Sequence, residues 1–262
     1  MDVADARMQR KSAVIVSAST DCYPDTPIPE VFDRLVDVEY STVEIALRHG
    51  PGRLSPADVL RDVDKAVALC RDTHRLVISG YSVDIEAQGE EHYEQFAACC
   101  RLARSTKVAS LTVPSGELGT PFNQEVEHLR RLVAIATMES VVVSIRSQIG
   151  CLSEDPDTTV VLCDNVKGLG VTLDPSHYIC EPNAGRNYDK LLKYTYNVRL
   201  RDTSPKQLQV RVGQGEVDYG KLITMLRRLG YDRALCVHMG PAPGIDHMAE
   251  MRKMRLLLES LI

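Results

Sequence analysis

The stretch "GLGVTLDPSHYICEP" (residues 168–182) joins a short run of apolar and β-branched residues to a polar loop. The run ends at Asp174, and His177 follows three residues later. An uncharged, β-branched run that gives way to a turn is typical of a strand buried in a parallel sheet. Asp before Pro also commonly begins a turn, so Asp174 has a structural interpretation beside a chemical one. The stretch predicts a buried strand with two ionisable groups at its carboxyl end.

Similar runs recur along the chain and alternate with longer amphipathic stretches, which is typical of repeated βα units. The predicted strands are 12–19, 41–48, 74–81, 107–114, 140–147, 168–174, 196–202 and 234–239. One predicted helix spans 55–73, with Ser55 as N-cap and Pro56 as its first residue. A second predicted helix follows Pro121, and another forms the end of the chain. Eight such units over residues 1–262 predict an α/β fold of one domain, a single (β/α)8 TIM barrel. A doubly wound sheet would need a Gly-rich turn after the first strand, and none is present.

Composition excludes several classes of protein. The net charge of −5 and the scattered Lys and Arg residues give no footprint for nucleic acid. No uncharged apolar run reaches the length of about 18 residues that a membrane helix needs, and the N-terminus has no apolar signal segment. The eight cysteines show no C-x-x-C spacing, which predicts buried reduced thiols. We therefore expect a cytoplasmic protein without membrane or nucleic-acid partners.

The barrel prediction gives the opening stretch a chemical meaning, because active sites of this fold lie where the strands end. Polar residues occur on or after the other late strands as well, and Glu44 lies inside the second predicted strand. Alternation with period two places Ser144 and Arg146 on one face. The candidate site residues are Asp174, His177 and His238 for catalysis and Glu44, Arg146, Arg199 and Asp202 for substrate binding. Each also has a structural alternative, such as an ion pair of Arg199 or Arg201 with a carboxylate.

Three segments resemble the xylose-isomerase-like TIM barrels, a family of sugar isomerases, sugar and sugar-phosphate epimerases and apurinic-site endonucleases. They are "VEIAL" (43–47), "VTLDPSHY" (171–178) and "VRLRDTS" (198–204) followed by "VRVGQGEVDYGKLITMLRRLGYDRALCV" (210–237). The resemblance runs in order along most of the chain. It implies a barrel that acts on a small sugar or sugar phosphate, and it makes a homo-oligomer an expectation.

The resemblance also implies a divalent metal, held by Glu, Asp, His and Glu on strands five to eight. Only the Asp is matched here, by Asp174, with His177 at a companion position; the other three positions carry Arg146, Arg199 and His238. Such a set has a charge of about +1 without any metal, and guanidinium groups cannot be ligands. We expect the arginines to hold an anionic oxygen of the ligand in place of the cation. Replacing Arg146 or Arg199 by Met should then abolish binding of an anionic sugar and leave the fold intact. A zinc site of Asp174, His177, His238 and Cys236 is the alternative.

Three functions remain open at this point. The first is a sugar or sugar-phosphate isomerase or epimerase that moves a proton next to a carbonyl, with His177 or His238 as general base. The second is a non-catalytic barrel that binds a sugar-like anion. The third, an apurinic-site endonuclease, is disfavoured because it needs a crowded cluster of metal ligands.

Overall fold

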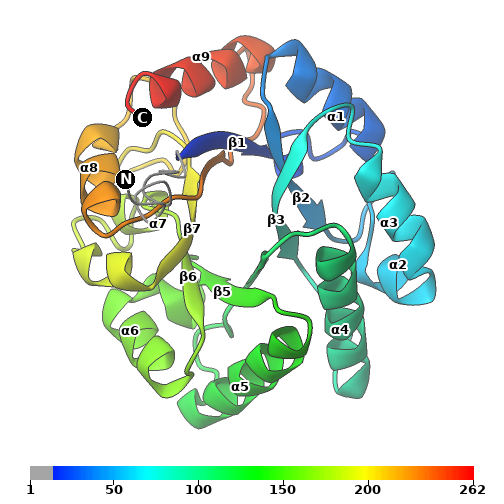
Figure 1. Cartoon of the computed structure of the whole chain (residues 1–262). Coiled ribbons are helices and arrows are strands. Elements are labelled where there is room, and N and C mark those ends of the chain that lie inside the picture. The colour runs from blue at the N-terminus through cyan, green and yellow to red at the C-terminus, as the bar shows by residue number, and fades with distance from the viewer. Residues whose placement is uncertain (1–13) are drawn as a thin grey trace, which may run out of the picture.

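The computed structural model describes residues 14–262, which form a closed barrel of eight parallel strands in sequence order (Figure 1). The first two residues of the predicted strand 12–19 and the N-terminal stretch before them lie outside the described residues. The strands are β1 (Ile15–Ser19), β2 (Thr42–Leu47), β3 (Val77–Val83), β4 (Ser110–Val113), β5 (Val142–Arg146), β6 (Gly170–Leu173), β7 (Thr195–Leu200) and β8 (Ala234–Val237). The ring closes where Ala18 of β1 pairs with Val237 of β8. The predicted fold class, a (β/α)8 barrel, is confirmed.

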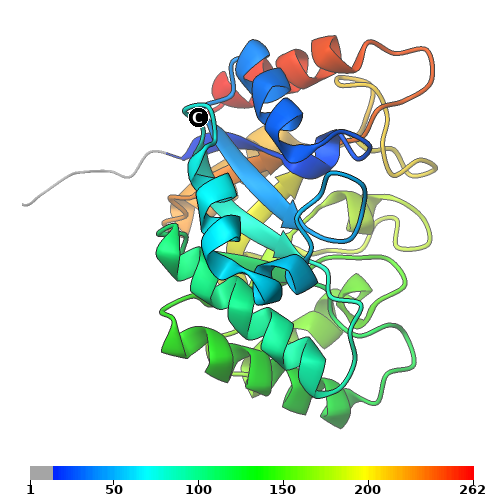
Figure 2. The ribbon, with the colours of Figure 1, turned by 90° about the vertical axis from the view of Figure 1, so that its right-hand side faces the viewer.

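Helices surround the barrel on the outside (Figure 1). They are α1 (Ile28–Asp37), α2 (Pro56–Arg61), α3 (Val63–Arg71), α4 (Glu90–Ser105), α5 (Phe122–Met138), α6 (Pro156–Asn165), α7 (Ser176–Ile179), α8 (Tyr219–Arg228) and α9 (His247–Glu259), with 3-10 turns η2 (Thr20–Cys22), η3 (Leu152–Glu154) and η4 (Asp189–Tyr194). The loops that follow the strands gather at one end of the molecule (Figure 2). That end is the mouth of the barrel, where this fold places its chemistry.

The stretch 55–73 forms two helices, so the prediction of one helix is wrong. Ser55 begins α2 as predicted, because its side chain and that of Asp58 form a reciprocal capping box. At Asp62 the backbone leaves the helical region, with φ −153° and ψ 86°. The Asp62 side chain then accepts a hydrogen bond from the amide of Lys65 and begins α3. A second N-cap residue inside an apolar periodic pattern was the signal for this break.

The barrel interior is unusually polar. Hydroxyl groups of Thr112, Ser144 and Thr172 form a chain, with oxygen to oxygen distances of 2.8 and 2.7 Å. Because side chains alternate along a strand, the face that carries Thr172 also carries Asp174, and the face of Ser144 carries Arg146. The hydroxyl groups inside the barrel are therefore continuous with the charged side chains at its mouth.

The cysteines agree with the prediction of reduced thiols. All eight lie among the described residues, and each is buried and unpaired. Between residues 14 and 262, no helix is both long and apolar enough to cross a membrane.

Candidate active site at the barrel mouth

A cavity of about 510 Å³ lies at the mouth, and five of the predicted site residues line it. They are Arg146, Asp174, His177, Arg199 and His238. They come from four neighbouring strand ends, β5 to β8, so the closed barrel brings together residues that are distant in sequence. Glu44 lies deeper in the barrel, and Asp202 lies in the loop after β7 without lining this cavity.

Asp174 is a buried carboxylate fixed on both oxygens. Its Oδ1 accepts the amide of Ser176 at 3.1 Å and also the Ser176 hydroxyl, and its Oδ2 accepts Nη2 of Arg201 at 2.8 Å. Burial alone would raise the pKa of Asp174, but the charge of Arg201 and the Ser176 hydrogen bond hold the pKa below its ordinary value. Asp174 is therefore ionised at neutral pH and partly neutralised by Arg201.

His177 lies beside Asp174, with its Nε2 3.7 Å from Oδ2 of the carboxylate. The backbone N–H of Ile149 donates to Nδ1 at 3.2 Å, which assigns the ring proton to Nε2. Burial lowers the pKa of His177 to about 4, although the Asp174 charge opposes this shift. The imidazole is therefore neutral at physiological pH.

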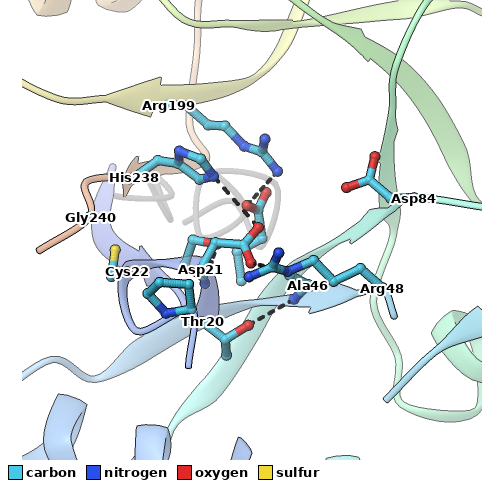
Figure 3. A network of polar contacts seen from close by, with 12 residues as sticks. Thr20, Asp21, Cys22, Ala46, Arg48, Asp84, Arg199, His238 and Gly240 are labelled. Atoms are coloured by element: carbon cyan, nitrogen blue, oxygen red, sulfur yellow. Dashed lines mark hydrogen bonds and ion pairs between the residues drawn. The ribbon is translucent and has the colours of Figure 1, made fainter. Parts of the chain in front are cut away.

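His238 occupies the opposite side of Arg201, whose Nη2 lies 2.9 Å from Nδ1 of the ring. Its Nε2 faces Oδ2 of Asp21 at 3.8 Å. Burial lowers the pKa of His238, and the charge of Arg199 lowers it further. Figure 3 shows Asp21 between His238 and Arg48, whose Nε lies 2.7 Å from Oδ1 of Asp21. Arg201 thus links Asp174 to a second neutral imidazole.

Asp21 is held in place by the turn η2. The side chain of Ser19 accepts the amide of Asp21 at 3.2 Å. The buried guanidinium of Arg53 donates to the carbonyl oxygens of Thr20 and Tyr23 at 3.2 and 2.7 Å. Burial would raise the pKa of Asp21, but its contacts with His238 and Arg48 hold that pKa below its ordinary range. The carboxylate is therefore charged and rigidly placed.

Glu44 and Arg199 pair with each other inside the barrel. Nη2 of Arg199 donates to Oε1 of Glu44 at 2.8 Å, and the side-chain amide of Asn197 donates to Oε2 at 3.0 Å. The side chains of Glu44 and Arg199 are 1% and 4% exposed, respectively. The guanidinium, predicted to bind substrate, thus has a carboxylate partner, although Arg199 is one of the residues that line the cavity. The structural alternative, an ion pair, describes this geometry.

Arg146 is also paired. Its Nη1 lies 2.7 Å from Oδ1 of Asp84, the residue directly after β3, and its Nε donates to Oε1 of Gln148 at 2.6 Å. Its side chain remains 18% exposed. It can therefore contact a ligand while staying bound to Asp84.

Asp202 holds the glycine-containing loop that follows it. Its Oδ2 accepts the amides of Gly213 and Gly215 at 2.7 and 3.0 Å. A Cβ at Gly215 would lie 2.1 Å from Oδ1, so glycine is required for this close approach. Asp202 was predicted to bind substrate, but in the structure its carboxylate shapes the "VGQGEVD" loop.

Sequence reasoning missed three charged residues of the mouth, Asp21, Arg48 and Asp84, and considered Arg201 only as a partner in an ion pair. Each of the three missed residues follows one of the first three strands. The rule that strand ends carry the site, applied to β1, β2 and β3 as it was to the late strands, would have found them. Their carboxylates are the partners that the expected arrangement of unpaired arginines lacked. Four arginines here lie 2.7–2.8 Å from a carboxylate oxygen, in the pairs Arg48–Asp21, Arg146–Asp84, Arg199–Glu44 and Arg201–Asp174, and Arg53 lies 3.9 Å from Asp21.

The mouth offers few ligands for a metal ion. Among residues 14–262, no group of three or more His, Cys, Asp or Glu side chains is arranged to hold one. Cys236, part of the zinc alternative, is fully buried, and burial raises the pKa of its thiol well above the ordinary value. Neither the zinc site nor the metal cluster of an endonuclease has support in this geometry.

The architecture defines a (β/α)8 barrel protein with a polar cavity at the carboxyl ends of its strands. The family model of the xylose isomerase-like TIM barrel matches residues 32–256. The chain therefore belongs to the xylose isomerase-like TIM barrel family, as its motifs predicted.

Solved structures agree with this fold. A D-tagatose 3-epimerase-like protein superposes with a TM-score of 0.73 at 15% identity, covering 95% of this chain and 98% of that one. A xylose isomerase domain protein from Alicyclobacillus acidocaldarius subsp. acidocaldarius gives 0.74 at 16% identity, and a D-allulose 3-epimerase from Methylomonas sp. gives 0.74 at 13%, each with 95% and 98% coverage. None of the curated proteins matches the sequence. At these identities the likeness concerns the fold.

Proposed function

We propose that this protein is a sugar isomerase or epimerase that moves a proton next to a carbonyl group without a resident metal ion. The observation that carries the proposal is the position of Arg201, which contacts both Asp174 at 2.8 Å and the Nδ1 of neutral His238 at 2.9 Å. A fixed cation beside a neutral base is what enolate chemistry requires. The epimerases among its structural neighbours support the same class of substrate.

The residues present do not fit the metal that the family resemblance implies. Of the four corresponding positions, Arg146 and Arg199 carry guanidinium groups, which stay protonated and cannot be ligands. Both are fixed by carboxylates, Asp84 and Glu44, so neither carboxylate is free to replace the lost ligands. We therefore derive the reaction from the side chains of the chain alone.

In the proposed reaction the carbonyl oxygen of the sugar accepts the Nη2 hydrogen bond that Arg201 now gives to His238. The lone pair on Nδ1 of His238 is then free to take the proton from the carbon next to the carbonyl. The electrons of the broken C–H bond move to the carbonyl oxygen and form an enediolate, whose charge Arg201 stabilises. The hydroxyl proton on the neighbouring oxygen then passes to the former carbonyl oxygen, and return of the proton from His238 to the former carbonyl carbon completes an isomerisation. Delivery of a proton to the opposite face of the same carbon would complete an epimerisation; His177 is the candidate donor once its Nδ1 has exchanged the Ile149 hydrogen bond for a proton from water, and His238 then releases its proton to water.

Deuterium exchange tests this proposal without knowledge of the natural substrate. Chelator-treated protein is incubated in D2O with a panel of ketoses and aldoses, and NMR follows deuterium at the carbons next to the carbonyl. We expect exchange without added metal, and a loss of about a hundredfold or more in Arg201→Met and His238→Gln. Arg61→Ala, at an exposed pair on α2, is the matched control. Exchange that appears only after a divalent metal is added would refute the metal-free mechanism.

A non-catalytic barrel that binds a sugar is the second candidate, and one observation favours it. In the structure the Nδ1 of each mouth histidine already accepts a hydrogen bond, from Ile149 for His177 and from Arg201 for His238. If this contact of His238 persists when a sugar is bound, no base is free. Sugar binding without deuterium exchange in the same experiment would identify this function.

A further inference from the structure

A second cavity opens beside the mouth, between the first turns of α4 and α5, with a volume of about 1080 Å³. His92 and Tyr93 of α4 and His128 of α5 line it. Arg146 and Gln148 line both this cavity and the mouth cavity. The two cavities therefore meet at these two side chains.

The boundary between the cavities is rigid. Arg146 is held by Asp84 at 2.7 Å and by Gln148 at 2.6 Å, so its guanidinium cannot swing freely into either space. A ligand that occupies both cavities would pass this guanidinium. The mouth, at about 510 Å³, is about half as large as the second cavity, so a substrate confined to the mouth would leave the larger space unused.

The polar groups of the second cavity are suited to hydroxyl groups. His128 is hydrogen-bonded through Nδ1 to the hydroxyl of Tyr93 at 3.0 Å, and His92 through Nδ1 to the carbonyl of Ala87 at 3.2 Å. In each ring Nε2 remains for a ligand. Burial lowers the pKa of His128 to about 4 and also lowers the pKa of His92, so both rings are neutral. A neutral imidazole exchanges hydrogen bonds with a hydroxyl group at little desolvation cost.

The guanidinium groups of Arg130 and Arg131, which line the second cavity from α5, already have partners. Arg130 pairs with Glu127 at 2.6 Å. Arg131 pairs with Glu90 at 2.5 Å, and its guanidinium lies 3.7 Å from the centre of the Tyr93 ring. These guanidinium groups are not free to bind a phosphate. Glu117, Glu125 and Glu127 also line the cavity and would repel an anion, so the cavity suits a neutral ligand better than a phosphate.

We propose that the second cavity binds a neutral sugar unit joined to the sugar that reacts at the mouth, so that the substrate is a glycosylated sugar. The reacting unit lies against Arg201 and His238, and the attached unit lies against His92, Tyr93 and His128 beyond Arg146. This inference rests on the proposed function for the chemistry at the mouth. It extends that function by naming a substrate of two units without a phosphate group.

Binding measurements on the full chain test the proposal. NMR titrations give Kd for D-fructose, for its glucosyl derivatives maltulose and isomaltulose, and for fructose 6-phosphate. We expect at least one glucosyl ketose to bind about tenfold more tightly than D-fructose, the gain expected from a few added hydrogen bonds. In His128→Ala and Tyr93→Ala this ratio should fall to near one. His74→Ala, which changes a half-exposed histidine before β3 at the opposite end of the barrel, should keep it.

The outcomes are separate from those of the proposed function, because binding is measured and turnover is not. Loss of the ratio in both cavity variants, with its retention in His74→Ala, supports the second subsite even if no proton is exchanged. The absence of a gain for both glucosyl ketoses overturns it. So does a gain that survives in His128→Ala and Tyr93→Ala, or tighter binding of fructose 6-phosphate than of either glucosyl ketose.

Discussion

Two arginines of one strand end, Arg199 and Arg201, pair with carboxylates in two different environments. Arg199 meets Glu44 inside the barrel, where both side chains are at most 4% exposed. Arg201 meets Asp174 at the mouth, where its side chain is 12% exposed and also contacts His238. The two pairs have the same length, 2.8 Å.

The difference shows that depth, more than residue type, separates a pair closed inside the barrel from a pair that a ligand can reach. Both carboxylate oxygens of Glu44 accept hydrogen bonds, one from Arg199 and one from Asn197. The pair of Glu44 and Arg199, the inner pair, lies deep in the barrel. The outer pair, Arg201 and Asp174, faces the mouth cavity. Nη2 of Arg201 now donates to His238, and a ligand in the cavity can accept this hydrogen bond instead. Residue type and strand position alone made Arg199 the better candidate, because it occupies the position of a metal ligand in the family.

Replacing Arg199 by Met should have the largest effect on stability. It leaves the carboxylate of Glu44 buried without its cation, and breaking a buried pair in this way costs about 3–5 kcal/mol. This replaces the sequence-based expectation that the substitution spares the fold. Urea unfolding followed by circular dichroism measures the loss, and the double variant Glu44→Leu/Arg199→Met should recover part of it. A loss no larger than that of Arg201→Met would place the inner pair in the same class as the outer one.

Replacing Arg201 by Met should cost less stability and more function. Asp174 keeps its two hydrogen bonds from Ser176, so we expect a loss of about 1–3 kcal/mol in the free energy of unfolding. Deuterium exchange should nevertheless fall about a hundredfold. Unfolding and exchange are measured on the same preparation, since a protein destabilised as much as Arg199→Met would contradict the distinction between the two depths.

Stability should fall between pH 7 and pH 5, in part because of His177. Its folded pKa of about 4 lies below the unfolded value near 6.5, so the unfolded chain takes a proton that the folded protein refuses. The stability that the neutral ring contributes is present above the unfolded pKa and is lost as pH falls toward 4. For this group the loss between pH 7 and pH 5 is about 2 kcal/mol.

The variant His177→Gln isolates this contribution from those of the other buried histidines. Urea unfolding at both pH values should give a smaller pH dependence for the variant than for the parent protein. The depressed pKa of Asp174 does not interfere, because it acts only near and below the ordinary value of 3.8. Equal pH dependence in both proteins would mean that His177 is not held neutral at the mouth.

The smallest effect is expected for an exposed pair of the same chemistry. Arg61 and Asp58 lie 2.8 Å apart on α2 with side chains 76% and 40% exposed. Arg61→Ala should change the free energy of unfolding by less than about 0.5 kcal/mol, because water screens the pair. Urea unfolding checks this lower end of the series. A loss as large as that of Arg201→Met would show that depth does not order these pairs.

Much of the fold was predictable from sequence because strand periodicity is a local property. The predicted strand 140–147 contains β5, Val142–Arg146, and the predicted strand 168–174 contains β6, Gly170–Leu173. The break at Asp62 was missed because apolar periodicity continues across it. Helix-capping chemistry at that residue determines where α2 ends.

The candidate site was predictable in its location and less so in its partners. Asp174, His177 and His238 line one cavity as the barrel prediction implies, although their catalytic role remains a proposal. The pairing of Glu44 with Arg199, 155 residues away in the chain, depends on side-chain depth in the closed barrel. Sequence alternation gives the face of a residue but not its depth or its partner.

The inner pair also bears on how the barrel assembles. Glu44 belongs to β2 and Arg199 belongs to β7. A partly folded barrel that contains only one of these strands would therefore bury a charge without its counter-ion. Such half-built barrels are disfavoured by several kcal/mol compared with the complete ring. We therefore expect the inner pair to suppress partly folded intermediates and to make unfolding more cooperative, a property distinct from its contribution to stability.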